Sequence, residues 1–171
     1  MNKRCRVLIT SECNLRCEYC CNKLPEVQAT IKMTTMDQFI EEIAPKYEEI
    51  SISGGEPMLA EDKLINIIYS LPENAKKYLY TNGSYSPSII FPIHLLNGVN
   101  IGVHQELNSS DLLCWLKEIA ESNPTCSLRF HMQEGVSFPN TEEFAILYNI
   151  PIIRWQMNKC GDPTTEDRYI I

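Results

Sequence analysis

The sequence lacks long apolar runs and an excess of positive charge. No stretch approaches the roughly 18 consecutive apolar residues that a membrane-spanning helix needs, so no membrane association is expected. With 15 lysines and arginines against 22 aspartates and glutamates, the net charge is −7. Because a nucleic-acid backbone selects basic surfaces, no nucleic-acid polymer is expected as a partner. A nucleotide monomer stays open as a substrate.

The first residues also lack the pattern of a secretory signal. They are basic, but the apolar run at residues 7–9 is too short for one. We therefore expect a cytoplasmic protein, in which many thiols favour metal binding or redox chemistry over structural disulfides. The length of 171 residues predicts one domain over residues 1–171, with a core at 4–157 and a short tail at 158–171.

Short apolar runs alternate with segments of helical periodicity along the chain. Strands are expected at residues 4–10, 49–53, 77–80, 99–104, 126–132 and 150–157. Capping boxes beginning at Thr35 and Asn140 predict two helix starts, and further helices are expected at 61–71 and 108–121. Residues 86–96 stay ambiguous because two prolines interrupt them, and the tail fits either a helix or a docking strand. The alternation predicts an α/β fold with parallel strands.

Cysteine is the unusual residue, with eight in the chain and five in the first 21 positions. Cys13, Cys17 and Cys20 form a C-x3-C-x2-C run directly after the first expected strand. A structural zinc ion and an ordinary [4Fe–4S] cluster each take four protein ligands. Three thiolates on a cubane would leave one iron open to a substrate or cofactor. A zinc site completed by Cys21, Cys5 or a histidine is the alternative.

The cysteine run resembles the signature loop of the radical S-adenosylmethionine (SAM) enzymes, C-x3-C-x-aromatic-C, with Tyr19 at the aromatic position. Residues 51–57, Ser-Ile-Ser-Gly-Gly-Glu-Pro, resemble that family's GGEP motif after the second strand. Thr81-Asn82-Gly83 resembles a turn that many members carry after the third strand. The resemblance covers about residues 4–157 and implies a partial (β/α)6 radical-SAM-type barrel of parallel strands.

The resemblance also implies roles for single residues. Cys13, Cys17 and Cys20 would hold a [4Fe–4S] cluster, and the backbone of Tyr19 would contact the adenine of SAM. Gly54, Gly55 and Glu56 would meet the methionine amino group of SAM. Further candidate SAM contacts are Thr81, Asn82, His104 and Gln105. An external one-electron donor would reduce the cluster, SAM would be cleaved, and the resulting 5′-deoxyadenosyl radical would abstract a hydrogen from the substrate.

Alternation on the later strands predicts which side chains enter the barrel. The polar faces hold Asn100, Gly102 and His104, then Arg129 and His131, then Arg154 and Gln156, whereas Trp155 and Met157 would face the helices. Buried arginines need anionic partners, so Arg129 and Arg154 would bind SAM or substrate, or pair with Glu106 or Glu134. His131 is a further substrate-site candidate, either for proton transfer or as a structural histidine.

The substrate itself is not encoded in these motifs. We expect a small anionic molecule, such as a nucleotide or an amino-acid derivative. The alternative is a partner protein on which the chain installs a glycyl radical, because Cys20-Cys21-Asn22 resembles an activase pattern. A non-catalytic zinc- or cluster-binding module is the alternative from another class. Cys160 is either a hydrogen-atom donor or a bystander, and Cys5, Cys114 and Cys126 are expected to pack.

Overall fold

A computed structural model describes residues 3–156 and 166–171. The described residues contain one parallel sheet in the order β2-β8-β1-β3-β4-β5-β6-β7. The strands are β1 (Arg4–Leu8), β2 (Ile31–Met33), β3 (Glu49–Ser53), β4 (Lys76–Thr81), β5 (Gly98–Val103), β6 (Ser127–Gln133), β7 (Ile152–Trp155) and β8 (Asp167–Ile170). The α-helices are α1 (Pro25–Gln28), α2 (Met36–Gln38), α3 (Glu61–Ser70), α4 (Ser110–Ser122) and α5 (Pro139–Leu147).

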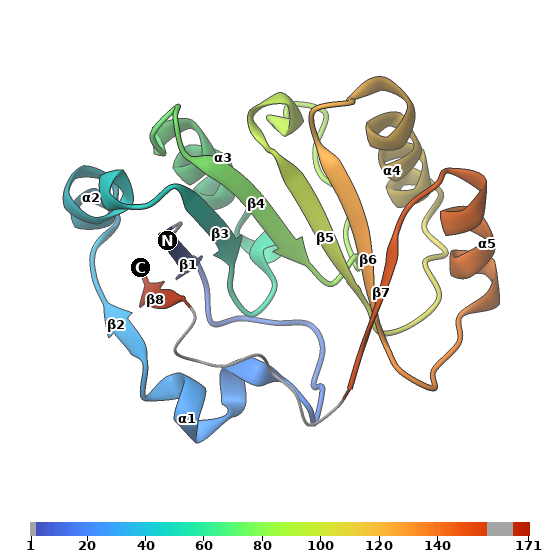
Figure 1. The fold of residues 1–171 in the computed structure, drawn as a ribbon, viewed down its shortest axis with the longest axis horizontal. Coiled ribbons are helices and arrows are strands. Elements are labelled where there is room, and N and C mark those ends of the chain that lie inside the picture. Colours follow the sequence, from blue (N-terminus) through green and yellow to red (C-terminus); the bar gives the residue numbers. More distant parts are fainter. Residues whose placement is uncertain (1–2, 157–165) are drawn as a thin grey trace.

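The predicted α/β fold with a partial barrel of parallel strands is confirmed. The six expected strands are β1 and β3 to β7, and they lie side by side in chain order. Figure 1 shows the sheet bending into an arc, with α3, α4 and α5 along its outer side. The carboxyl ends of parallel strands all point to the same edge, so the loops after β1, β3, β4 and β5 meet there. Among the described residues, no helix is long and apolar enough to cross a membrane.

Strands β2 and β8 were not predicted as members of this sheet. The sequence fits either a helix or a docking strand at the end of the chain, and the structure has a strand, β8, which pairs with β1 on one side and β2 on the other. Tyr169 of β8 packs its ring 5.5 Å from that of Phe39, which is fully buried. The sheet therefore includes strands from both sides of the expected boundary between core and tail, because β8 lies in the expected tail.

Of the two expected capping boxes, the structure has the one at Thr35 and lacks the one at Asn140. Thr35 caps α2, because its side chain accepts a hydrogen bond from Gln38 N at 3.2 Å, and Ser109 caps α4 in the same way. The capping box expected at Asn140 is wrong: α5 begins at Pro139, whose fixed φ suits a first helical position. A π-helical segment (Phe39–Ile43) continues α2, and residues 86–96 contain a short 3₁₀ turn (Ile93–Leu95).

One face of the sheet forms the hydrophobic core against the outer helices. Its strands contribute the fully buried Val7, Ile52, Leu79, Ile101 and Phe130, at alternate positions. They pack in one cluster with buried helix residues, among them Leu64, Ile67, Leu112 and Leu116. The other face of the sheet is therefore directed away from the helices, and its side chains line a cavity.

Candidate functional site

The cavity has a volume of about 450 Å³ and lies at the carboxyl ends of the strands. The loop after β1 forms one side of it, and residues of β1, β3, β4, β5, β6 and β7 form the rest. Ten of the residues expected in the site line it together: Cys13, Cys17, Tyr19, Cys20, Gly55, Glu56, Thr81, Asn82, His104 and His131. The fold thus gathers most of the sequence-based candidates in one place.

The three cysteines of the motif lie in the loop after β1 and line the cavity. Cys20 N donates a hydrogen bond to Cys17 O at 3.4 Å, and Leu15 N donates to Cys13 Sγ at 3.4 Å. Cys13 is exposed, and Cys17 and Cys20 are half-buried, so all three thiols face the cavity and solvent rather than the core. Burial raises the pKa of Cys17 above its ordinary value.

These thiols fit an iron–sulfur cluster in their chemistry and placement. Thiolates are the usual ligands of such clusters, and the three share one cavity wall. In the described part of the chain, no group of three or more Cys, His, Asp or Glu side chains converges as around a single metal ion. A cubane presents its iron atoms at separate corners and so accepts thiols that are further apart. Two expected fourth zinc ligands are unsuitable: Cys5 is fully buried in the core, and Cys21 is disulfide-bonded.

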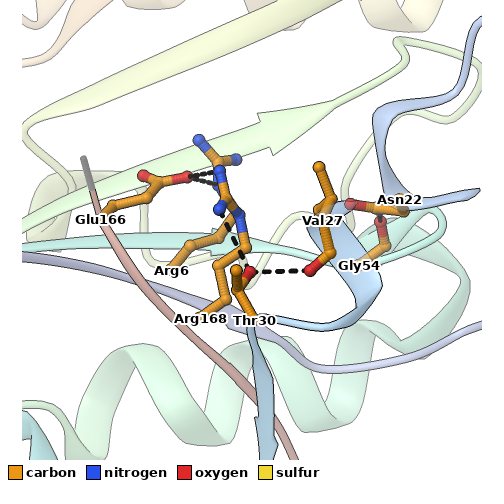
Figure 2. A network of polar contacts seen from close by, with 7 residues as sticks. All are labelled: Arg6, Asn22, Val27, Thr30, Gly54, Glu166 and Arg168. Atoms are coloured by element: carbon orange, nitrogen blue, oxygen red, sulfur yellow. Dashed lines mark hydrogen bonds and ion pairs between the residues drawn. The ribbon is translucent and has the colours of Figure 1, made fainter. Parts of the chain in front are cut away.

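Gly55 lets the cysteine loop lie directly on the end of β3. Gly55 N donates to Thr10 O at 2.8 Å and Glu56 N donates to Glu12 O at 2.7 Å. A Cβ on Gly55 would lie 2.0 Å from Glu12 O, so only glycine permits this approach. On the other side of the loop, Asn22 Nδ2 donates to Gly54 O at 2.7 Å, as Figure 2 shows. Gly54 itself lies behind the cavity wall.

Glu56 links the end of β3 to the turn after β4. Its side chain is fully buried. Oε1 accepts hydrogen bonds from Met58 N at 3.0 Å and Thr81 Oγ1 at 2.6 Å, and Oε2 accepts from Asn82 N at 2.6 Å. Burial raises the pKa of Glu56, and these three donors oppose that shift by stabilising the carboxylate. The carboxylate therefore holds two loops of the cavity together.

Aromatic side chains form the wall beside the cysteines. Tyr19 Oη and His104 Nδ1 lie 3.0 Å apart in a hydrogen bond, and the Tyr19 and Trp155 rings lie 5.2 Å apart. Burial lowers the pKa of His104, so its imidazole is neutral at pH 7. Such a wall can stack on the flat ring of a ligand. Gln105, in contrast, is exposed and does not line the cavity.

The floor of the cavity is polar and carries an arginine, Arg6 of β1. Its guanidinium lies 4.3 Å above the Tyr80 ring, and its Nε donates to Glu166 Oε1 at 2.8 Å (Figure 2). Burial lowers the pKa of Arg6, but Glu166 and Tyr80 outweigh this, so its pKa is raised and it stays charged. Beside it, His131 Nε2 donates to Asn100 Oδ1 at 3.0 Å. Burial lowers the pKa of His131, as do the charges of Arg129 and Arg6.

The two arginines expected inside the barrel are not among the lining residues. Arg154 points toward α5, where it forms a salt bridge with Glu142 at 3.1 Å, and it also donates to Val136 O. The expected faces of this strand are therefore reversed, because Trp155 enters the cavity instead. Arg129 shares the inward face with His131 but is exposed, at the register position of Asn100. Neither pairs with Glu106, which caps α5 through Thr141.

Arg6 was missed, although a signal for it was present. Cys5 and Val7 were assigned to the core, and strict alternation places Arg6 on the opposite, inward face. Trp155 was missed because an apolar side chain was assumed to face the helices. Met157 and Cys160, which were also considered, lie outside the described residues.

The comparisons with known proteins agree with this geometry. The model of the family described as a 4Fe-4S single cluster domain matches residues 3–111. A probable GTP 3′,8-cyclase from Archaeoglobus fulgidus is 39% identical over 83 residues, which are 46% of this chain. The match covers 27% of that protein's length. Because the family model covers more than half of the chain, the chain belongs to the 4Fe-4S single cluster domain family and, with it, to the radical SAM enzymes, whose cofactors are a [4Fe–4S] cluster and SAM.

Proposed function

We propose that Cys13, Cys17 and Cys20 hold the [4Fe–4S] cluster, and that the cavity beside them binds SAM and a small anionic substrate, from which a hydrogen atom is abstracted. One observation carries the proposal. A single cavity at the carboxyl ends of the strands has the three thiols on one wall and a charged guanidinium, that of Arg6, in its floor. Candidate cofactor ligands and a candidate substrate anchor therefore face the same cavity.

Held by Cys13, Cys17 and Cys20, a reduced cluster would supply the one electron that breaks the sulfonium C–S bond of SAM, which would release methionine and leave the radical that abstracts hydrogen from the substrate. The chain's own residues position the reactants. Gly55 allows the loop with the thiols to lie on the sheet. The carboxylate of Glu56 links the end of β3 to the turn after β4 through its hydrogen bond from Asn82 N. We assign the contacts with the nucleoside part of SAM to the backbone at Tyr19 and the side chain of His104, because both residues line the aromatic wall beside the thiols.

Arg6 supports an anionic substrate. A guanidinium has five N–H donors. Nε uses one of them on Glu166 and Tyr80 also interacts with the group, so the remaining N–H donors can bind a further oxyanion. Arginine binds phosphates and carboxylates with two parallel hydrogen bonds, so nucleotides and amino-acid derivatives are the classes to test. The relative from Archaeoglobus fulgidus is named for GTP, itself an anionic nucleotide, and we place nucleotides first.

The cofactor assignment is tested by anaerobic reconstitution of the full chain with iron and sulfide. Reduced protein given SAM is expected to release 5′-deoxyadenosine, detected by mass spectrometry. Cys13→Ala, Cys17→Ala and Cys20→Ala should each lose the cluster's absorbance and the product. Cys114→Ala is the matched control, because this exposed cysteine lies on α4, outside the cavity lining. Tightly bound zinc with no product, or full activity in the three variants, would contradict the proposal.

The substrate class is tested by the transfer of deuterium. Deuterated nucleotides and amino-acid derivatives are incubated one by one with the reduced enzyme and SAM, and the mass of 5′-deoxyadenosine is measured. Deuterium gained from one of these small molecules supports the proposal. Product formed without deuterium from any of them, together with a radical on an added protein, would instead support the activating-enzyme alternative.

A further inference from the structure

Asn82, in the turn after β4, contacts the cysteine loop from across the cavity. Its side-chain amide nitrogen, Nδ2, lies 2.9 Å from Asn14 Oδ1 and 3.9 Å from Cys13 Sγ. An amide NH₂ group carries two hydrogens. One is directed to the oxygen of Asn14, and the other is available to the sulfur of Cys13.

The conformation of Asn82 is fixed from three sides. Its backbone N–H donates to Glu56 Oε2 at 2.6 Å, and its Oδ1 accepts from Ser84 N at 2.9 Å. Glu56 is in turn held by Thr81 Oγ1 at 2.6 Å and is fully buried. A continuous path of hydrogen bonds thus runs from the buried carboxylate through Asn82 to the thiol of Cys13. These contacts direct the amide nitrogen toward the cysteine loop.

We propose that Asn82 is a positioning residue that donates an N–H···S hydrogen bond to the cluster ligand Cys13 and thereby raises the cluster's reduction potential. The proposal rests on the assignment of Cys13 as a ligand under the proposed function. Reduction adds negative charge to the cluster and its sulfur ligands. A hydrogen bond donated to a ligand sulfur stabilises the reduced form more than the oxidised form, and such bonds are among the factors that set the potential.

Cys13 receives two donors in this structure, and they differ in origin. Leu15 N donates from within the cysteine loop at 3.4 Å, so the loop backbone supplies it in every variant. Asn82 Nδ2 comes from a different strand end, and a substitution removes it without touching the loop. The structure therefore offers a way to delete one N–H···S contact and keep the other.

The test measures the midpoint potential of the reconstituted full chain by a redox titration followed with electron paramagnetic resonance. Asn82→Ser keeps a short oxygen that can accept from Ser84 N, but it lacks the amide donor. Its potential is expected to be more negative than that of the unmodified protein. Asn14→Ala removes the other partner of the amide and leaves the donor to Cys13 intact, so its potential should stay unchanged. Under a fixed weak reductant, Asn82→Ser should also cleave SAM more slowly.

A second pair of variants covers the case in which Asn82→Ser does not assemble a cluster. Asn82→Asp has nearly the same shape and keeps the acceptor for Ser84, while Asn14→Asp adds the same charge beside the cluster and keeps the donor. The potential of Asn82→Asp is expected to be the more negative of the two.

The inference is overturned by equal potentials within either pair, or by failure of both Asn82 variants to assemble while both Asn14 variants do, because Asn82 would then have only a structural role. If the unmodified chain assembles no cluster, or Cys13→Ala retains one, the proposed ligand assignment fails and this inference falls with it. The two failures are therefore distinguishable.

Discussion

Replacing Gly55 by alanine is expected to detach the cysteine loop from the sheet. The new Cβ would lie 2.0 Å from Glu12 O and 2.4 Å from Glu12 C, whereas ordinary contacts begin at 3.4 Å. The loop backbone would have to move by about 1 Å or more, since a carbonyl cannot rotate away as a side chain can. The hydrogen bonds from Gly55 N to Thr10 O and from Glu56 N to Glu12 O would then be lost or lengthened.

The expected loss of stability follows from the steric clash of the new Cβ and from the two weakened hydrogen bonds. Each backbone hydrogen bond contributes about 1 kcal/mol net, and forcing a group into packed structure costs about 1–3 kcal/mol. The free energy of unfolding of Gly55→Ala should therefore fall by about 3–5 kcal/mol, measured by urea denaturation of the reduced, cofactor-free protein. Iron and sulfide incorporated on reconstitution should fall as well, because the three thiols move with the loop.

Gly102→Ala is the matched control, because Gly102 lines the same cavity. Its Cβ would lie 3.0 Å from His104 Nε2, a side-chain atom that can shift by a few tenths of an ångström, and the next atoms are at the ordinary contact distance of 3.7 Å. Its stability should change by less than about 1 kcal/mol, since alanine also suits a strand better than glycine. Equal stability and equal iron content for the two variants would refute the reasoning about the loop contact.

The remaining predictions concern the cavity floor and the core. Arg6→Met should raise the KM for an anionic substrate by about tenfold to a hundredfold, because a charged hydrogen-bonding partner is lost. Arg129→Ala is the control and should leave the KM unchanged. Both are measured by steady-state kinetics, and equal KM values for the two variants would remove Arg6 from the substrate site. Burial, with the charges of Asp167 and Glu166, raises the pKa of Cys5 to about 12, so the folded state keeps a proton that the unfolded chain releases near pH 9. Stability should consequently fall as the pH rises from about 9 to 12, and urea titrations of Cys5→Ala should show a shallower fall; the same slope in both proteins would contradict this. Phe130→Ala should lower the free energy of unfolding by about 3–5 kcal/mol, because this fully buried side chain fills the core between the sheet and the helices. A decrease below about 1 kcal/mol, measured by thermal unfolding, would mean that neighbouring side chains fill the space it leaves.

Hydrophobic periodicity, together with proline and capping residues at the ends of segments, was enough to predict most of the strands and helices. The bounds of β3 were predicted without error, and those of β1, β4, β5 and β6 to within two residues. Each of these strands has one face in the core and one toward the cavity, so apolar and polar side chains alternate along it. Proline or a capping side chain marks the ends of the helices. β2 and β8 have three and four residues, and they form because β8 pairs with β1 on one side and with β2 on the other. Pairings between segments so far apart in the chain leave no local pattern.

The sequence by itself determined the family motifs of this protein: three cysteines at fixed spacing, and the glycines and glutamate after the second predicted strand, are local patterns that can be recognised without the fold. Only the tertiary structure decided which polar face points inward. Alternation separates the two faces of a strand, but the side that receives a covering helix depends on the whole sheet. On β7, Trp155 enters the cavity beside Tyr19 and Arg154 pairs outside with Glu142. The guanidinium of the cavity floor belongs to Arg6 instead, on a strand where the neighbouring core residues had already implied its direction.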